Sequence, residues 1–481
     1  APLHIEVKPN QVMAQETTAS TDTANTATTA SHEVTYNLKT RLGGTPSMAF
    51  VGVGGEIDEQ TNPLLTANVG DTVTIHLVNS DPVIHDFKVP DFNVTTGELT
   101  QAGQEGTVTF VADRPGDSSY ICSVVGHEAA GMKGTLRISG EASTTVAAQP
   151  TAVPGGYDTT TVSAAPADPN AVSIIRNPTD LPVPVGNRAP MHLQVDLTAI
   201  EVKGQLADGT TFDYFTFDGQ VPGPMIRIRV GDMVDLHFKN ADGSLFPHSI
   251  DLHAVTGPGG GAVYTQMVPG QENIFTFQAL NPGLYVYHCA TASIPHHISS
   301  GMYGMILVEP EGGLPPVSRE FYVMQGEIYT EQPFGTPGQL TFSMDHLSHE
   351  DADYMVFNGA AGALTKDEYA LHANVGDTVR IYFGVGGPNY TSSFHVIGEI
   401  FDRVYETASL TSEPLTDVQT TLVPPGGATV VEFTTEVPGR YILVDHALSR
   451  LERGLAGYLY VDGADNPEVY HSESDPSMAG H

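Results

Sequence analysis

Short segments in which apolar and polar residues alternate recur along the chain, and three of them are variants of one pattern. Asn68-Val-Gly-Asp-Thr-Val-Thr-Ile-His-Leu returns as Arg229-Val-Gly-Asp-Met-Val-Asp-Leu-His-Phe, and again as Asn374-Val-Gly-Asp-Thr-Val-Arg-Ile-Tyr-Phe. Each copy begins with a Gly-Asp turn and continues with the period-two alternation of a half-buried strand. The sequence therefore predicts three structural repeats.

Each repeat also closes in the same way, with a strand between two glycine turns. Pro-Gly pairs stand at 115–116, 282–283 and 438–439, and Gly-x-x-Gly turns follow at 131–134, 301–304 and 454–457. Short strands at even spacing, separated by Gly and Pro, are typical of antiparallel sandwiches. We therefore expect an all-β protein built from three Greek-key β-sandwich domains.

Composition shifts mark the borders between these domains. Residues 9–31 and 141–170 are rich in Ala, Thr, Ser and Pro and carry almost no apolar pattern, which is typical of flexible segments. The expected units are a flexible tail with the first strand (1–40), a first domain (41–140), a flexible linker (141–185), a second domain (186–312), a third domain (313–465) and a C-terminal tail (466–481).

The two cysteines of the chain each begin the same series of metal-binding residue types. The first domain contains His85, Cys122, His127 and Met132, and the second contains His248, Cys289, His297 and Met302. One thiolate, two imidazoles and a thioether are the ligands of a type 1 (blue) copper site. A histidine in mid-domain followed by Cys, His and Met near its end matches the cupredoxin fold. We expect both cysteines to be ligands and neither to form a disulfide.

The second domain carries further histidines beside its predicted copper site. His288 immediately precedes Cys289, and His253 follows His248 by one short strand. Adjacent residues of a strand point to opposite faces, so His288 can contribute to a second metal site while Cys289 faces the first. In the first domain Ile121 precedes Cys122, which predicts a site that only transfers electrons.

The third domain has lost the ligands of a blue copper site. Asp445 stands where the repeat predicts cysteine and Leu455 where it predicts methionine, yet His395 and His446 remain. These two histidines are either remnants of a former site or ligands that this domain supplies to a neighbouring metal.

Charge narrows the choice of partners and location. The chain has 20 Lys and Arg against 56 Asp and Glu, a net charge of −36. Such a surface repels nucleic acid and anionic membranes, and it suits either solubility in a saline habitat or the attraction of a basic electron donor. No segment has the length and apolarity of a membrane span or the form of a signal peptide. We expect a mature exported protein, periplasmic or otherwise extracytoplasmic.

Several motifs of the second and third domains together resemble copper-containing nitrite reductases. They are His248-Ser-Ile-Asp251-Leu-His253-Ala-Val-Thr-Gly-Pro-Gly-Gly-Gly, Tyr287-His288-Cys289-Ala, His297-Ile-Ser-Ser-Gly-Met302, Phe394-His395-Val-Ile397-Gly-Glu, Thr421-Leu-Val-Pro-Pro-Gly-Gly and Leu443-Val-Asp-His446. The resemblance covers about residues 186–465. Residues 41–140 resemble the extra N-terminal cupredoxin domain of a minority of that family. No tryptophan is present, and His296 stands where the family often has a large side chain.

The resemblance implies a homotrimer, or a larger assembly of trimers, that reduces nitrite to nitric oxide for denitrification. It implies two type 1 coppers and one type 2 copper per chain. His253 and His288 would bind the type 2 copper together with His446 of the adjacent subunit. Asp251 and His395 would handle protons, and Ile397 would gate the substrate. A small cupredoxin or cytochrome c would supply electrons.

Two other functions remain as alternatives at the level of sequence. A multicopper oxidase would need several His-x-His pairs for its trinuclear cluster, and the chain contains no His-x-His. A non-catalytic two-copper electron carrier would explain the first two domains but leave His253, His288 and His446 without a role. The number of coppers per chain separates the three: three for the reductase, two for the carrier, and more than three for the oxidase.

Overall fold

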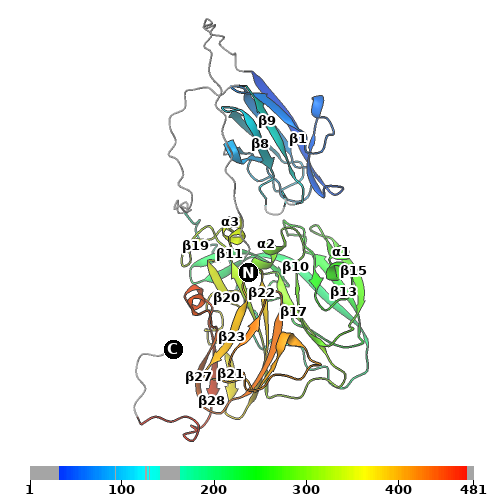
Figure 1. The fold of residues 1–481 in the computed structure, drawn as a ribbon. Helices are drawn as coiled ribbons and strands as arrows, with labels where there is room; N and C mark the ends of the chain where they lie inside the picture. The colour runs from blue at the N-terminus through cyan, green and yellow to red at the C-terminus, as the bar shows by residue number, and fades with distance from the viewer. Residues whose placement is uncertain (1–31, 93, 125–126, 129, 141–162, 474–481) are drawn as a thin grey trace, which may run out of the picture.

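The computed structural model describes residues 32–92, 94–124, 127–128, 130–140 and 163–473 (Figure 1). Within these ranges the chain is all-β, as predicted. Its strands form six sheets, and the α-helices are short: α1 (Ala262–Thr265), α2 (Ile294–Ser299) and α3 (Met344–Ser348). In the described part of the chain, no helix has the length and apolar character needed to cross a bilayer.

The first pair of sheets encloses a core of its own, to which both sheets contribute buried side chains such as Phe50, Val73, Tyr120 and Leu136. One sheet has the order β2-β1-β4-β7 and the other β3-β9-β8-β5-β6. The strands are β1 (Glu33–Leu42), β2 (Met48–Gly52), β3 (Leu65–Asn68), β4 (Thr72–Val78), β5 (Lys88–Val89), β6 (Val94–Thr95), β7 (Glu105–Val111), β8 (Gly116–Ile121) and β9 (Lys133–Ser139).

The second pair of sheets follows the same plan. Its sheets have the orders β15-β13-β10-β11-β19 and β12-β17-β16-β14. The strands are β10 (His192–Ala207), β11 (Thr210–Phe217), β12 (Ile226–Arg229), β13 (Met233–Asn240), β14 (Asp251–Leu252), β15 (Glu272–Gln278), β16 (Gly283–His288), β17 (Tyr303–Glu309) and β19 (Gly338–Gln339). The last of these, β19, comes from the sequence assigned to the third domain, so the two domains are interleaved at this edge.

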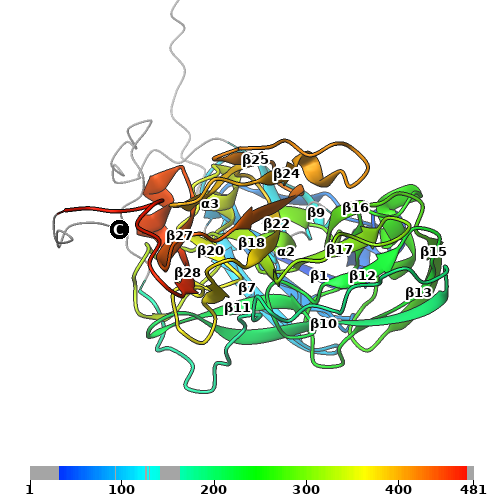
Figure 2. The same ribbon diagram turned by 90° about the horizontal axis from the view of Figure 1, so that it is seen from below.

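The third pair has the sheet orders β20-β18-β22-β26-β24 and β21-β28-β27-β23-β25. The strands are β18 (Arg319–Ile328), β20 (Tyr354–Phe357), β21 (Leu371–Asn374), β22 (Thr378–Gly387), β23 (Ser392–Ile397), β24 (Arg403–Tyr405), β25 (Thr421–Val423), β26 (Ala428–Thr434), β27 (Gly439–Asp445) and β28 (Gly457–Asp462). Figure 2 shows this sandwich packed beside the second one. One buried cluster, which includes Tyr303, Met305, Tyr322 and Met324, spans both of them.

The repeated Gly-Asp turn explains why the three sandwiches are alike. In each copy the glycine has a positive φ, between 89° and 95°, which favours glycine because it has no Cβ. The aspartate carboxylate then accepts a hydrogen bond from a backbone N–H three residues earlier. These bonds join Asp71 to Asn68 at 2.8 Å, Asp232 to Arg229 at 2.8 Å, and Asp377 to Asn374 at 2.9 Å. The motif therefore fixes the turn into an inner strand of each sandwich.

The structure corrects the predicted linker over its second half. Residues 163–185 lie against the second and third sandwiches: Ile174 and Ile175 are buried, and Val172 and Ile175 form backbone bridges to Gly204 and Val221. Isolated apolar residues among Pro, Asn and Ala gave no periodic signal, so this part was wrongly predicted to be flexible. Residues 141–162, most of the predicted N-terminal tail (1–31) and the end of the C-terminal tail (474–481) lie outside the described residues.

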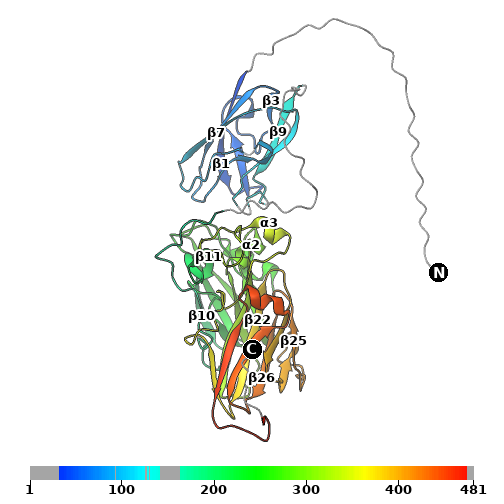
Figure 3. The same ribbon diagram turned by 90° about the vertical axis from the view of Figure 1, so that its left-hand side faces the viewer.

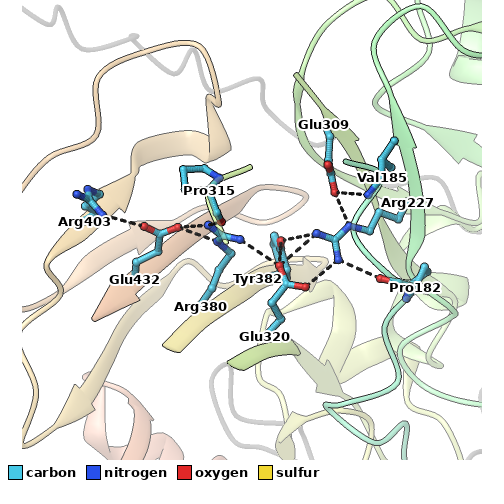
Figure 4. A network of polar contacts seen from close by, with 10 residues as sticks. All are labelled: Pro182, Val185, Arg227, Glu309, Pro315, Glu320, Arg380, Tyr382, Arg403 and Glu432. Atoms are coloured by element: carbon cyan, nitrogen blue, oxygen red, sulfur yellow. Dashed lines mark hydrogen bonds and ion pairs between the residues drawn. The ribbon is translucent and has the colours of Figure 1, made fainter. Parts of the chain in front are cut away.

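A buried network of charged side chains joins the second and third sandwiches (Figure 4). Arg227 on β12 donates to Glu309 at 2.5 Å and to Glu320 on β18 at 2.8 Å. Glu320 also accepts from Tyr382 at 2.7 Å and from Arg380 at 3.0 Å, and Arg380 pairs in turn with Glu432. Because the Arg227 side chain is fully buried, its two carboxylate partners depend on it for compensation.

Replacing Arg227 with methionine should destabilise the pair of sandwiches strongly. Removing one partner of a buried ion pair costs about 3–5 kcal/mol, since the remaining charges lose their compensation, which corresponds to a fall of roughly ten degrees in melting temperature. Differential scanning calorimetry measures this. Lys239→Met is the matched control, because the Lys239–Asp242 pair is exposed and such pairs contribute about 0–1 kcal/mol. Equal melting temperatures for both variants would contradict the assignment.

Candidate metal centres

In the first sandwich, three donor atoms converge on one buried point. The Cys122 Sγ lies 3.3 Å from His127 Nδ1 and 3.9 Å from His85 Nδ1, and the two Nδ1 atoms are 3.2 Å apart. Met132 is fully buried, and its backbone accepts from Cys122 N–H and donates to His127 C=O. All four residues predicted for this site thus share one region of the first core.

The second sandwich repeats the cluster almost atom for atom. The Cys289 Sγ lies 3.3 Å from His297 Nδ1 and 4.0 Å from His248 Nδ1, with 3.2 Å between the two Nδ1 atoms. Met302 is fully buried and makes the same two backbone hydrogen bonds as its counterpart. Cys289 follows β16 directly, and His297 lies on α2.

The distances fit a metal ion at the centre of each cluster. Metal–nitrogen and metal–sulfur bonds of about 2.0 and 2.3 Å place three ligand atoms around one ion about 3.5 Å apart, and the measured separations bracket that value. Two Nδ1 atoms that face each other at 3.2 Å cannot both carry a proton. The donor set therefore suits a shared cation better than direct hydrogen bonds.

Burial prepares the ligands for a metal. It lowers the pKa of His248 to about 3, and together with the neighbouring His85 it lowers that of His127 to about 3, so both imidazoles are neutral at physiological pH. Burial raises the pKa of Cys289 and of Cys122. Because the metal-binding form of cysteine is the thiolate, a cation at the cluster would offset the cost of burying that charge.

A second, more accessible group lies beside the middle cluster. The His253 Nε2 and His288 Nε2 are 3.1 Å apart, and Asp251 joins them in a set whose donor atoms lie within 4.8 Å of one another. Asp251 on β14 pairs directly with His288 on β16. A Cβ on Gly260 would come within 1.9 Å of the Asp251 carboxylate, which explains why position 260 is a glycine.

His395 and His446 form a separate pair on the third sandwich. Their rings lie 5.8 Å apart, and His395 Nδ1 is 2.6 Å from the Gln419 carbonyl. Ile397 lies two residues further along β23 and is half-buried. Among the described residues, the groups with metal-binding geometry contain neither His395 nor His446. Within one chain, the predicted type 2 ligands therefore form two separate groups: His253 with His288, and His446 on the third sandwich.

Asp445 has taken a structural role in the third sandwich. Its buried carboxylate accepts hydrogen bonds from Ser393 N–H at 3.0 Å and Ala447 N–H at 3.1 Å, from Gln325 Nε2 at 3.0 Å, and it pairs with Arg450. Leu455 is fully buried in the core of this sandwich. Arg450 follows Asp445 at the same interval by which His127 follows Cys122, so an ion pair occupies the place of two copper ligands.

Two carboxylates near the buried clusters were missed by the sequence reading. Glu201 Oε1 lies 2.9 Å from His248 Nε2, and Asp81 Oδ2 lies 3.4 Å from His85 Nε2. Such partners orient a metal-binding imidazole. Asp81 lies four residues before His85, a spacing that could have suggested it. Glu201 is remote in sequence and gave no signal.

The chain is similar to proteins that handle copper. The multicopper oxidase family models match residues 198–313 and 335–465. The copper-containing nitrite reductase of Neisseria meningitidis serogroup A is 48% identical over 305 residues, which cover 63% of this chain and 78% of that protein. That of Alcaligenes xylosoxydans is 34% identical over 60% of this chain and 93% of that protein. The solved copper nitrite reductase of Nitrosomonas europaea superposes with a TM-score of 0.50 at 32% identity, covering 58% of this chain and 96% of that one.

Proposed function

Because the chain belongs to the copper-containing nitrite reductase family, we propose that it reduces nitrite to nitric oxide and water with copper as its cofactor. The reaction consumes one electron and two protons for each nitrite. The protein must therefore transfer an electron and protons to the bound nitrite, and each of these transfers can be assigned to particular side chains.

The observation that carries the proposal is that two sets of metal-binding residues are adjacent at the end of β16. Cys289 belongs to the buried cluster, while His288, the preceding residue, directs its Nε2 toward His253 at 3.1 Å. One peptide unit therefore connects a buried electron-transfer site to an accessible pair of imidazoles. A simple electron carrier has no use for the second site.

We assign two type 1 coppers and one type 2 copper to each chain. The type 1 ligands are those of the two buried clusters: His85, Cys122, His127 and Met132, and His248, Cys289, His297 and Met302. His253 and His288 hold the type 2 copper, completed by His446 of an adjacent subunit in a homotrimer. Bound copper supplies one-electron chemistry and, with three imidazoles, an open position for nitrite.

Asp251 and His395 supply the protons in this proposal. Asp251 lies beside the type 2 imidazoles and can hydrogen-bond the nitrite oxygen that leaves as water. His395 is an imidazole, the side chain suited to proton transfer near neutral pH, and its Nδ1 is oriented by the Gln419 carbonyl. Ile397, on the same strand, narrows the approach to the substrate.

Electrons come from a small donor protein, a cupredoxin or a cytochrome c, in the periplasm or another extracytoplasmic compartment. The net charge of −36 favours a basic donor, since complementary charge speeds encounter. Nitric oxide measured by electrode, with nitrite and a small reductant, tests the activity. Copper analysis should give three ions per chain. Oxygen consumption without nitric oxide would overturn the proposal.

Asp251→Asn and His395→Ala should each keep the full copper content but lower turnover about a hundredfold or more, because general acid assistance is lost. Asp235→Asn, which changes a partly exposed carboxylate on β13 of the same domain, is the control and should behave as wild type. Undiminished turnover in either site variant would show that the pair is wrongly assigned.

A further inference from the structure

The first sandwich lies against the end of the second one that carries α2, as Figures 1 and 3 both show. A cavity of about 500 Å³ lies at this contact. Its lining on the first domain includes Ile84 and Val124, and on the second domain Phe246 and His296. The contact is thus made where each sandwich holds its cysteine-centred cluster.

The first domain docks with the face that carries its metal ligands. Ile84 immediately precedes His85, Val124 follows Cys122 by two residues, and both side chains are buried. His127 and His297 are each only 1% exposed. Apolar residues around a metal site that are covered in this way form an interface between domains, not a free surface.

Phe246 is the side chain that connects the two cores. It packs against the apolar cluster of the first domain and also against that of the second. Its ring lies 6.5 Å from the His297 ring and 5.0 Å from Phe215, which is itself 5.1 Å from His297.

Glu201 holds Phe246 and a copper ligand in one arrangement. Its carboxylate accepts hydrogen bonds from the backbone N–H of Leu245 at 2.9 Å and of Phe246 at 2.8 Å. The same carboxylate lies 2.9 Å from His248 Nε2. The docking segment, residues 243–246, is therefore connected through one side chain to the cluster of the second domain.

We propose that the first domain docks on the second as an electron-transfer partner within the molecule, with Phe246 as the contact and Glu201 as the positioning residue. One electron leaves the reduced centre of the first domain and reduces the oxidised centre of the second, and no bond or proton moves. An external one-electron donor protein then re-reduces the first centre. The inference rests on the proposed function only in that both clusters bind copper.

Docking also closes the second domain's centre to external proteins. The face around His297 that a donor would approach is occupied by the first domain, so protein donors must deliver their electrons at Cys122. The first domain, which the sequence predicted to transfer electrons only, then acts as a relay docked on the second domain.

Electron redistribution after pulse radiolysis tests the proposal on the full-length, copper-loaded protein. The rate between the two blue centres should be independent of protein concentration. Phe246→Ala should slow it roughly tenfold, because transfer between held partners depends steeply on their spacing. Phe334→Ala, which removes another partly exposed ring of the same chain, is the matched control and should leave the rate unchanged.

Small-angle X-ray scattering supplies a second readout that does not depend on activity. Phe246→Asp and Ile84→Asp should each increase the radius of gyration, because a buried charge at the contact separates the domains. A transfer rate that rises with protein concentration, or Phe246 variants with wild-type rate and scattering, would overturn the proposal. Nitrite turnover with a small reductant, measured on the same samples, tests the proposed function independently.

The positioning role of Glu201 can be tested by two measurements on one variant. Glu201→Ala should slow the transfer and alter the electron paramagnetic resonance spectrum of the second-domain centre together, since His248 and the docking segment both lose their partner. Glu201→Gln keeps an oxygen acceptor and should restore most of the rate. If Glu201→Ala changed neither quantity, the carboxylate would have no positioning role.

Discussion

Cys289→Ala should abolish nitrite reduction with every electron donor. Cys289 is joined through the chain to His288, so the assigned route for electrons to the accessible imidazoles passes through it. Cys122→Ala should remove only part of the visible absorption and abolish turnover with a protein donor, while turnover with a small reductant that reaches the second domain directly is spared. Steady-state rates with both kinds of donor measure this difference.

The two cysteine variants serve as controls for each other, because each loses one of two buried clusters that have nearly identical geometry. Metal analysis should show the loss of one copper per chain in both. If Cys122→Ala also stopped turnover with the small reductant, the first centre would be an obligatory relay for all electrons. Residual nitrite reduction by Cys289→Ala would contradict the route through β16.

His446→Ala should lose the type 2 copper and keep both blue centres, so that copper falls from three ions to two per chain. In the proposed assignment the type 2 site takes His446 from an adjacent subunit, so metal binding is linked to assembly. Copper analysis with electron paramagnetic resonance checks this, and nitric oxide formation should stop.

His372→Ala is the control for that experiment, since His372 is an exposed histidine on β21 of the same sandwich. It should keep all three coppers. A catalytically active monomer, or a His446→Ala protein that retains type 2 copper, would exclude the shared site.

The repeats were predictable because their chemistry is local. The Gly-Asp turn forms its hydrogen bond within four residues, and the Cys, His and Met of each buried cluster are close in sequence. Residues 163–185 were misjudged because Ile174 and Ile175 are isolated apolar positions whose burial depends on surfaces built much later in the chain. The same holds for the network around Arg227, whose partners are distant in sequence.

The docking of the first domain could not be predicted for a related reason. Leu245 and Phe246 are two consecutive apolar residues shortly before His248. Such a short apolar segment is as compatible with a domain core as with a surface. Glu201 lies on β10 at the parity of the buried Leu197 and Ala199, but the sequence does not indicate which distant groups it contacts. Only the fold places these residues beside Ile84 and Val124.

In the third domain, the conformation of the loop that carries His446 does not depend on a bound metal. The loop that carries His446 is closed by the ion pair of Asp445 with Arg450, which forms as the chain folds and needs no ion from outside. In the other two domains the equivalent loop carries the proposed copper ligands His127 and His297. If the type 2 site is shared as proposed, a newly made subunit in a copper-starved cell already holds His446 in place for its neighbour, and subunits can assemble first and acquire copper afterwards.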